Sequence, residues 1–246
     1  MNDFEKHHFA EFKNGIANIK HTPYAFGLYI FCEEDDLRRP TVRLNTNTYE
    51  HANAHFLESK RKVLESKRKG HTDSLLDALW TDAYWIEKTE ASVGCKYISF
   101  TGDRVDEKGI FLRKQWIQEL GLWFEDSFEE TNFEESLDIG VKIVDHYYDL
   151  CVRLARYLHP FIANKFNTEL PIIIFNRECP NDESIELTFL ANPSYLLEGY
   201  ITYIRACCDE ESAKFLEQNV DKTNLTYALL KEKRFKKIFN SSQNGG

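Results

Sequence analysis

PYAFGLYIFC, residues 23–32, is a β-rich apolar run that stops at the acidic turn EEDD. After the turn, TVRLNT (41–46) alternates apolar and polar side chains, as a half-buried strand does, so the two segments predict a β-hairpin. ELPIIIFN (169–176) is a short, unbroken apolar run that follows a proline, which is typical of a strand buried on both faces. VGCKYISF (93–100) also alternates and predicts a further strand.

Helical patterns surround these strands. Apolar residues recur every three or four positions from Phe4 to Ile19, which predicts an amphipathic helix that ends before Pro23. Asn47, with Glu50 at the N3 position, predicts the cap of a second helix that stops at Gly70. Two more helices are expected at 73–88, where a strand is the alternative, and at 108–121, where Gly121 is the stop.

The second half of the chain is mostly helical. Thr131 and Glu134 predict a capping box that opens a long helix, which Pro160 is expected to end or kink. Phe133 and Leu137 share one apolar stripe of this helix with later core residues. Further helices are expected at 192–208, 209–219 and 222–239.

This order of elements indicates an α+β protein, with a mixed α/β arrangement as the alternative and a sheet of about four to five strands. Residues 1–204 are expected to form one domain, and residues 205–246 a helical extension with a frayed tail. No linker rich in proline, glycine or serine separates the two.

Composition narrows the class of protein. Apolar residues make up 42% of the 246, which is typical of a folded globular chain. No signal peptide or membrane-length apolar segment is found, which predicts a cytoplasmic protein without membrane contact. The six cysteines are scattered, apart from the vicinal pair Cys207-Cys208, so neither a zinc framework nor a disulfide scaffold is indicated, and no cofactor is expected.

One basic segment stands out against a net charge of −9: ESKRKVLESKRKG, residues 58–70. Helical geometry spreads its bases around the helix, whereas a phosphate-binding helix would gather them on one side. A solvated helix is therefore favoured, and a nucleic-acid accessory role is the third functional hypothesis. The bases concerned are Lys60, Arg61, Lys62, Lys67, Arg68 and Lys69.

Two small clusters resemble catalytic or metal sites. His51 and His55 have the spacing of two metal ligands on a helix, but the residues between them lack a general base, so a solvated face is favoured. Asp145, His146 and Asp149 fall within one helical turn and supply the alternative hypothesis of a small hydrolase. No phosphate loop, nucleophile elbow or Cys-His signature accompanies them.

The segment LWFEDSFEETNFEESLD (122–138) contains seven carboxylates, four aromatic rings and no base. Carboxylates near a helix N-terminus are favoured by the helix dipole, which is one explanation of the pattern. The other is an interface, because aromatic rings anchor and carboxylates steer a basic partner. The predicted partner-binding residues are Trp123, Glu125, Asp126, Glu129, Glu130, Glu134 and Glu135.

An ordered set of segments resembles the bacterial family catalogued as domain of unknown function 4303. The segments are PYAFGLYI (23–30), RLNTNTYEHA (43–52), DALWTDAYW (77–85), GLWFEDSFEE (121–130), LPIIIFNRE (170–178) and ANPSYLLEGYITYI (191–204). The resemblance spans residues 1–204 and carries no catalytic signature. Leu79-Trp80 stands where the pattern has an Arg-Trp pair, which puts in doubt any site that depends on that arginine.

These observations predict a non-enzymatic cytosolic module that binds protein. By analogy with small acidic proteins that neutralise toxins, the leading hypothesis is an immunity or antitoxin-like protein that occludes a basic toxin or effector. The acidic balance argues against a nucleic-acid partner.

Overall fold

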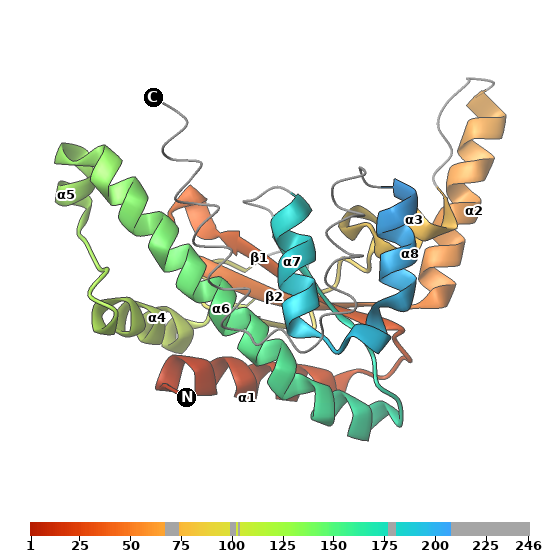
Figure 1. The fold of residues 1–246 in the computed structure, drawn as a ribbon, viewed down its shortest axis with the longest axis horizontal. Helices are drawn as coiled ribbons and strands as arrows, with labels where there is room; N and C mark the ends of the chain where they lie inside the picture. Colours follow the sequence, from red (N-terminus) through yellow and green to blue (C-terminus); the bar gives the residue numbers. More distant parts are fainter. Residues whose placement is uncertain (67–73, 99–101, 103, 177–180, 208–246) are drawn as a thin grey trace. The chain divides into compact units, whose positions relative to one another are not determined.

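The computed structural model describes residues 1–66, 74–98, 102, 104–176 and 181–207, and the chain divides into two compact units, 1–191 and 192–246 (Figure 1). The fold is α+β, as the sequence predicts. The second unit contributes η3 (Ser194–Leu197) and α8 (Glu198–Cys207) to the described residues. The helices predicted at 209–219 and 222–239 lie outside them, and the domain boundary at residue 204 stays a prediction.

The described residues of the first unit form one four-stranded mixed sheet in the order β3-β2-β1-β4. Strands β1 (Ala25–Cys32) and β2 (Pro40–Asn47) form the predicted antiparallel hairpin, with Leu28 opposite Leu44. Strand β4 (Ile172–Asn176) pairs parallel with β1, and the short β3 (Ala91–Val93) pairs antiparallel with β2.

Both faces of the hairpin are covered. Phe26 of β1 meets Phe166 on one face, with ring centroids 5.9 Å apart. On the other face, a Cβ atom on Gly27 would lie only 3.0 Å from the ring of Trp85, so glycine is needed for this close approach. β2 is therefore not half-buried as predicted: only Arg43 is partly exposed. The prediction that β4 is buried on both faces is confirmed, since Ile172 to Ile174 are inaccessible.

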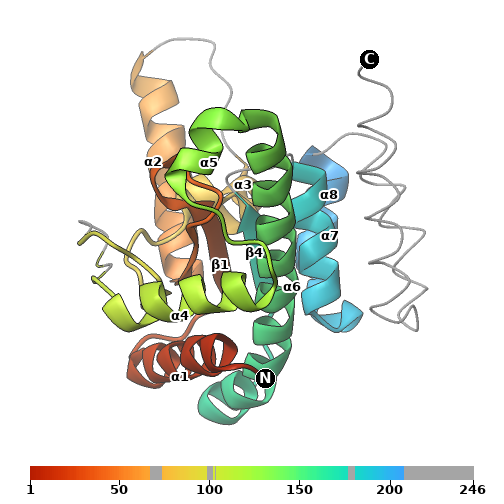
Figure 2. The same cartoon turned by 90° about the vertical axis from the view of Figure 1, so that its left-hand side faces the viewer.

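Helices surround this sheet. Figure 2 shows α6 and α7 together on one side of it, with α1 and α4 next to each other at its end. The remaining helices of the first unit are shorter, except α2. The bounds are α1 (Asp3–Asn18), α2 (Tyr49–Ser66), η1 (Glu33–Asp35), α3 (Leu75–Trp80), η2 (Asp82–Tyr84), α4 (Glu107–Glu119), α5 (Asp126–Thr131), α6 (Phe133–Phe166) and α7 (Asn181–Ala191).

Several predicted boundaries are wrong for identifiable reasons. Asn47 does not cap α2, because it is the last residue of β2 and its amide donates to the Tyr24 hydroxyl; the Thr48 hydroxyl accepts the N3 amide instead. Thr131 does not open the long helix, because it is the last residue of α5. Of the two alternatives predicted for Pro160, an end of the helix is wrong, because α6 continues to Phe166 with the proline on its exposed side, and a kink stays a prediction.

The strand predicted at 93–100 is also wrong over most of its length. β3 ends at Val93, and Gly94 has φ +82°, a left-handed conformation that turns the chain away from the sheet. Residues 99 and 100 lie outside the described part. The predicted stop of α4 at Gly121 is confirmed by its φ of +71°.

One carboxylate holds three elements together at this end of the sheet. Asp106 accepts hydrogen bonds from the amides of Gly94, after β3, and Gly109, in α4, at 3.0 and 2.9 Å. Its other partner is His7 of α1, whose Nε2 lies 3.0 Å from Oδ2. Burial raises the pKa of Asp106, but these hydrogen bonds outweigh burial and lower the pKa to about 2. We call this group the Asp106 hub.

A second buried polar contact joins α1 to α6. His8 is inaccessible; its Nδ1 lies 2.8 Å from the Phe4 carbonyl oxygen and its Nε2 lies 3.0 Å from the Tyr147 hydroxyl. The carbonyl can only accept, so Nδ1 carries the proton and the Tyr147 hydroxyl donates to Nε2. Burial lowers the pKa of His8 to about 4, which keeps the ring neutral at physiological pH.

Replacing Asp106 with asparagine should lower the free energy of unfolding by about 2–3 kcal/mol, because charge-assisted hydrogen bonds to three elements are weakened together. Urea denaturation followed by circular dichroism measures the change. Asp3→Asn on the exposed side of α1 is the matched control, and it should have no measurable effect. Equal stabilities for the two variants would contradict the role given to Asp106.

Stability should fall as the pH is lowered from 6.5 towards 4. The unfolded chain then binds a proton at His8, whose ordinary pKa is 6.5, while the folded chain binds it only near pH 4. The slope attributable to His8 is about 1.4 kcal/mol per pH unit at most. Urea denaturation at a series of pH values should show a flatter dependence in His8→Phe than in the wild type, and an equal dependence in the two proteins would contradict the role given to His8.

Candidate protein-binding surface

Arg38, in the turn between β1 and β2, fastens the acidic segment to the sheet. Its side chain is 8% exposed and pairs with Asp36 at 2.9 Å, Asp126 at 2.7 Å and Glu129 at 3.2 Å. It also donates to the Phe124 carbonyl oxygen and stacks over the ring of that residue at 4.8 Å. The guanidinium thus joins the hairpin to the beginning and middle of α5.

These contacts distinguish two of the predicted partner-binding residues from the others. Asp126 and Glu129 already have a cationic partner within the chain. Burial alone would lower the pKa of Arg38, but the hydrogen bonds that its guanidinium donates to Asp36 and Asp126 outweigh burial and raise the pKa, so the cation is retained. The internal role of these two carboxylates is the stability of α5, which buries no residue of its own.

Trp123 is also held within the chain. Its indole Nε1 donates to Glu125 at 2.8 Å, and the Lys114 ammonium lies 4.5 Å from its ring. The ring is half-buried between α4 and the loop before α5. Trp123 therefore helps to seat the loop and presents only part of its surface to solvent.

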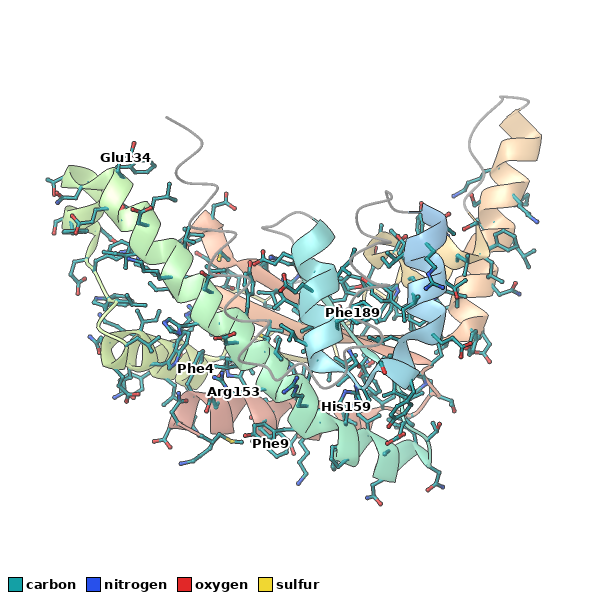
Figure 3. All side chains as sticks on the ribbon, viewed as in Figure 1. Phe4, Phe9, Glu134, Arg153, His159 and Phe189 are labelled. Carbon is teal, nitrogen blue, oxygen red and sulfur yellow. The ribbon has the colours of Figure 1, made fainter. Side chains whose placement is uncertain are left out.

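The first turns of α6 present apolar side chains to solvent. Phe133, Leu137 and Val141 are 63%, 46% and 41% exposed, and their spacing of four residues places them on one side of the helix. We call these three residues the α6 stripe. Two exposed carboxylates, Glu134 and Asp138, follow the α6 stripe along one edge, at about 60° from Leu137 or Val141, and form what we call its acidic rim. Figure 3 shows Glu134 projecting from the first turn of α6.

The turn of the β1–β2 hairpin packs against α6 next to the α6 stripe. A Cβ atom on Gly140 would lie 2.7 Å from Leu37, so the backbone of α6 touches the hairpin directly at this turn. After it, Ile143, Val144 and Tyr147 are buried. The predicted apolar stripe of the long helix therefore has two parts: its later residues enter the core, and its first residues stay exposed.

Two further predicted partner-binding residues, Glu130 and Glu135, lie outside the α6 stripe and its acidic rim. Glu130 is exposed at the end of α5. Glu135 is exposed on α6, but about 160° around the helix from Leu137, so it faces away from the α6 stripe. Val141 and Asp138 were not predicted as partner-binding residues; continuing the four-residue spacing from Phe133 and Leu137 would have found Val141.

The predicted hydrolase cluster lies on the middle of α6. Asp149 is buried. Asp145 and His146 are half-buried, and viewed along the axis of α6 they lie on opposite sides of Asp149. None of the three lines the cavity bounded by Met1, Glu5 and Arg153 or the hollow between α1 and β3. The hypothesis that these three residues are catalytic stays a prediction.

The predicted metal pair is not assembled into a larger site. His51 is exposed, whereas the ring of His55 lies 4.3 Å from that of Tyr84. Among the residues that the structure describes, no group of three or more histidine, cysteine, aspartate or glutamate side chains could hold a metal ion.

The described part of the basic helix makes local contacts. Arg61 and Lys62 pair with Glu58 at 2.7 and 3.6 Å, and the Lys60 ammonium lies 4.2 Å from the ring of Phe56. Lys67, Arg68 and Lys69 lie outside the described residues. None of the helices that the structure describes has the length and apolar character of a membrane span.

Comparisons with protein-family models, with curated proteins and with solved structures found no match to this chain. The resemblance to the bacterial family of unknown function accordingly stays a prediction.

Replacing Arg38 with glutamine should destabilise α5 locally without unfolding the sheet. The variant lacks the buried cation that binds Asp126 and Glu129, whereas the backbone hydrogen bonds between β1 and β2 remain. Hydrogen–deuterium exchange of the amides between residues 125 and 131 should accelerate about tenfold or more, corresponding to the loss of about 1.4 kcal/mol of local stability. The control is Arg39→Gln, since Arg39 is more exposed and pairs with Glu34 and Asp36 in the turn. Unchanged protection of α5 in the Arg38 variant would refute this role.

Proposed function

We propose that the protein is a non-enzymatic binding module of the immunity or antitoxin type, which acts in the cytoplasm and occludes a basic protein partner. The α6 stripe and its acidic rim form the centre of the proposed interface. The observation that carries the proposal is the exposure of Phe133, Leu137 and Val141 in a row beside carboxylates, in a segment of the sequence without a base.

The physical argument has two parts. Exposed large apolar side chains in a continuous row mark interaction sites, because burying them against a partner removes apolar surface from water at about 25 cal/mol per Å². Carboxylates at the edge of such a row add little affinity by themselves but accelerate association with a basic partner. The net charge of −9 acts in the same direction.

The rigid mounting of the surface supports the proposal as well. The buried Arg38 and the contact of Gly140 with Leu37 hold α5 and α6 on the hairpin, so a partner would meet a preformed helix face. Preformed surfaces bind with a smaller loss of conformational entropy than surfaces that become ordered on binding. A stable complex buries about 1,200–2,000 Å² in total, so neighbouring residues such as Glu130 would complete the interface.

The test is affinity capture with the full chain from the cells that express it, followed by purification of the captured protein and measurement of its affinity. We expect a basic partner, and we expect Leu137→Ser to weaken its binding at least about tenfold, because the centre of the α6 stripe is lost. Glu134→Lys should slow association and reduce its dependence on salt.

Glu135→Lys is the matched control, since it makes the same change of charge at the next residue, on the other side of α6. Asp126 and Glu129 are left intact, so that α5 stays in place. A captured partner that is acidic, or that binds wild type and Leu137→Ser with equal affinity, would refute the proposal.

A further inference from the structure

A polar hollow of about 560 Å³ lies between the second half of α1, β3 with the residues before it, and the loop that leads to the Asp106 hub. Small-molecule sites in proteins commonly enclose about 300–1,000 Å³, so the hollow has the size of a ligand site. We call it the α1–β3 hollow. Its walls carry the side chains of Glu11, Asn14, Asn18, Lys88, Glu90 and Arg104.

The base of the hollow is tightly packed. A Cβ atom on Gly15 would lie 2.7 Å from the Cβ of Ala91 and 2.8 Å from the Glu90 carbonyl oxygen, so α1 and β3 touch through their backbones. The Asp106 hub closes the neighbouring side through His7. The distance between the two walls is therefore set by packing that a ligand need not create.

The polar groups on the walls fall into two classes. Lys88 and Glu90 pair with each other at 3.2 Å, and Asp106 is bound within the hub. Within the described residues, by contrast, the side chains of Glu11 and Arg104 make no ion pair or hydrogen bond. The side-chain amides of Asn14 and Asn18 make no hydrogen bond there either. One carboxylate, one guanidinium and two amides thus remain available in the hollow.

Thr89 gives an independent indication that the polar groups here are incompletely satisfied. It lines the hollow and is 7% exposed, and its buried hydroxyl oxygen has no hydrogen-bond partner among the residues that the structure describes. Buried hydroxyl groups are almost always hydrogen-bonded in folded proteins.

We propose that the α1–β3 hollow binds a small zwitterion that carries an ammonium and a carboxylate group, as amino acids do. Glu11 would bind the ammonium group and Arg104 the carboxylate, while Asn14 and Asn18 supply amide hydrogen bonds. An anion without an ammonium group would leave Glu11 unpaired, and a cation without a carboxylate would leave Arg104 unpaired. A ligand with both charges satisfies both walls.

The proposal is tested by calorimetry on the full chain with glycine, γ-aminobutyrate and 6-aminohexanoate, whose charged groups are separated by increasing distances. We expect one of the three to bind with a Kd of about 1 mM or tighter. Acetate and ethylammonium, which carry one charge each, should bind at least about tenfold more weakly.

Arg104→Gln and Glu11→Gln should each weaken the binding of the preferred zwitterion about tenfold or more, and circular dichroism should show an unchanged fold because neither side chain has an ion pair or hydrogen bond to lose among the described residues. Arg61→Gln, on α2, is the control and should bind as the wild type does. Absence of binding for all three zwitterions, equal binding of acetate or ethylammonium, or full binding by both hollow variants would each overturn the proposal. None of these results depends on the α6 stripe, so the proposed protein-binding function is tested separately.

Discussion

The hydrogen bonds of the Asp106 carboxylate are the constraint on which the arrangement of this end of the molecule depends. One side chain accepts from α1, from the turn after β3 and from the first turn of α4, and α1 is far from the other two in the sequence. The short β3 has only three residues of its own to hold it in the sheet. The hub therefore places α1 against the sheet edge and α4 beside α1, and it defines one side of the α1–β3 hollow.

At the hairpin, Arg38 joins separate segments of the chain as Asp106 does at the other site. A buried cation with carboxylates around it is expensive to leave unpaired, so the turn, α5 and the loop at Phe124 are coupled. This coupling explains why a segment with seven carboxylates remains folded against the protein. It also leaves the carboxylates beyond α5, among them Glu134 and Asp138, without that cation and available to a partner from outside.

Much of the fold could be predicted from local patterns, and the errors have a common cause. The hairpin and β4 were predicted correctly because apolar composition and turn residues act over a few positions. The burial of both faces of β2 was missed because the segment after Trp85, whose carbonyl oxygens accept from the Asn45 amide, comes from a distant part of the chain. Asn47 was misassigned as a cap for the same reason: its amide is bound by Tyr24, across the hairpin.

For the proposed interface, the sequence by itself determined where carboxylates and aromatic rings are concentrated, because that is a matter of composition. Only the tertiary structure decided which of them are bound internally. Asp126 and Glu129 have the same side-chain chemistry as Glu130 and Glu134, and only the position of Arg38, which the chain brings back from the hairpin, separates the two pairs. Long-range packing makes this choice, because the strength of an ion pair depends on distance in space and on burial rather than on separation along the chain.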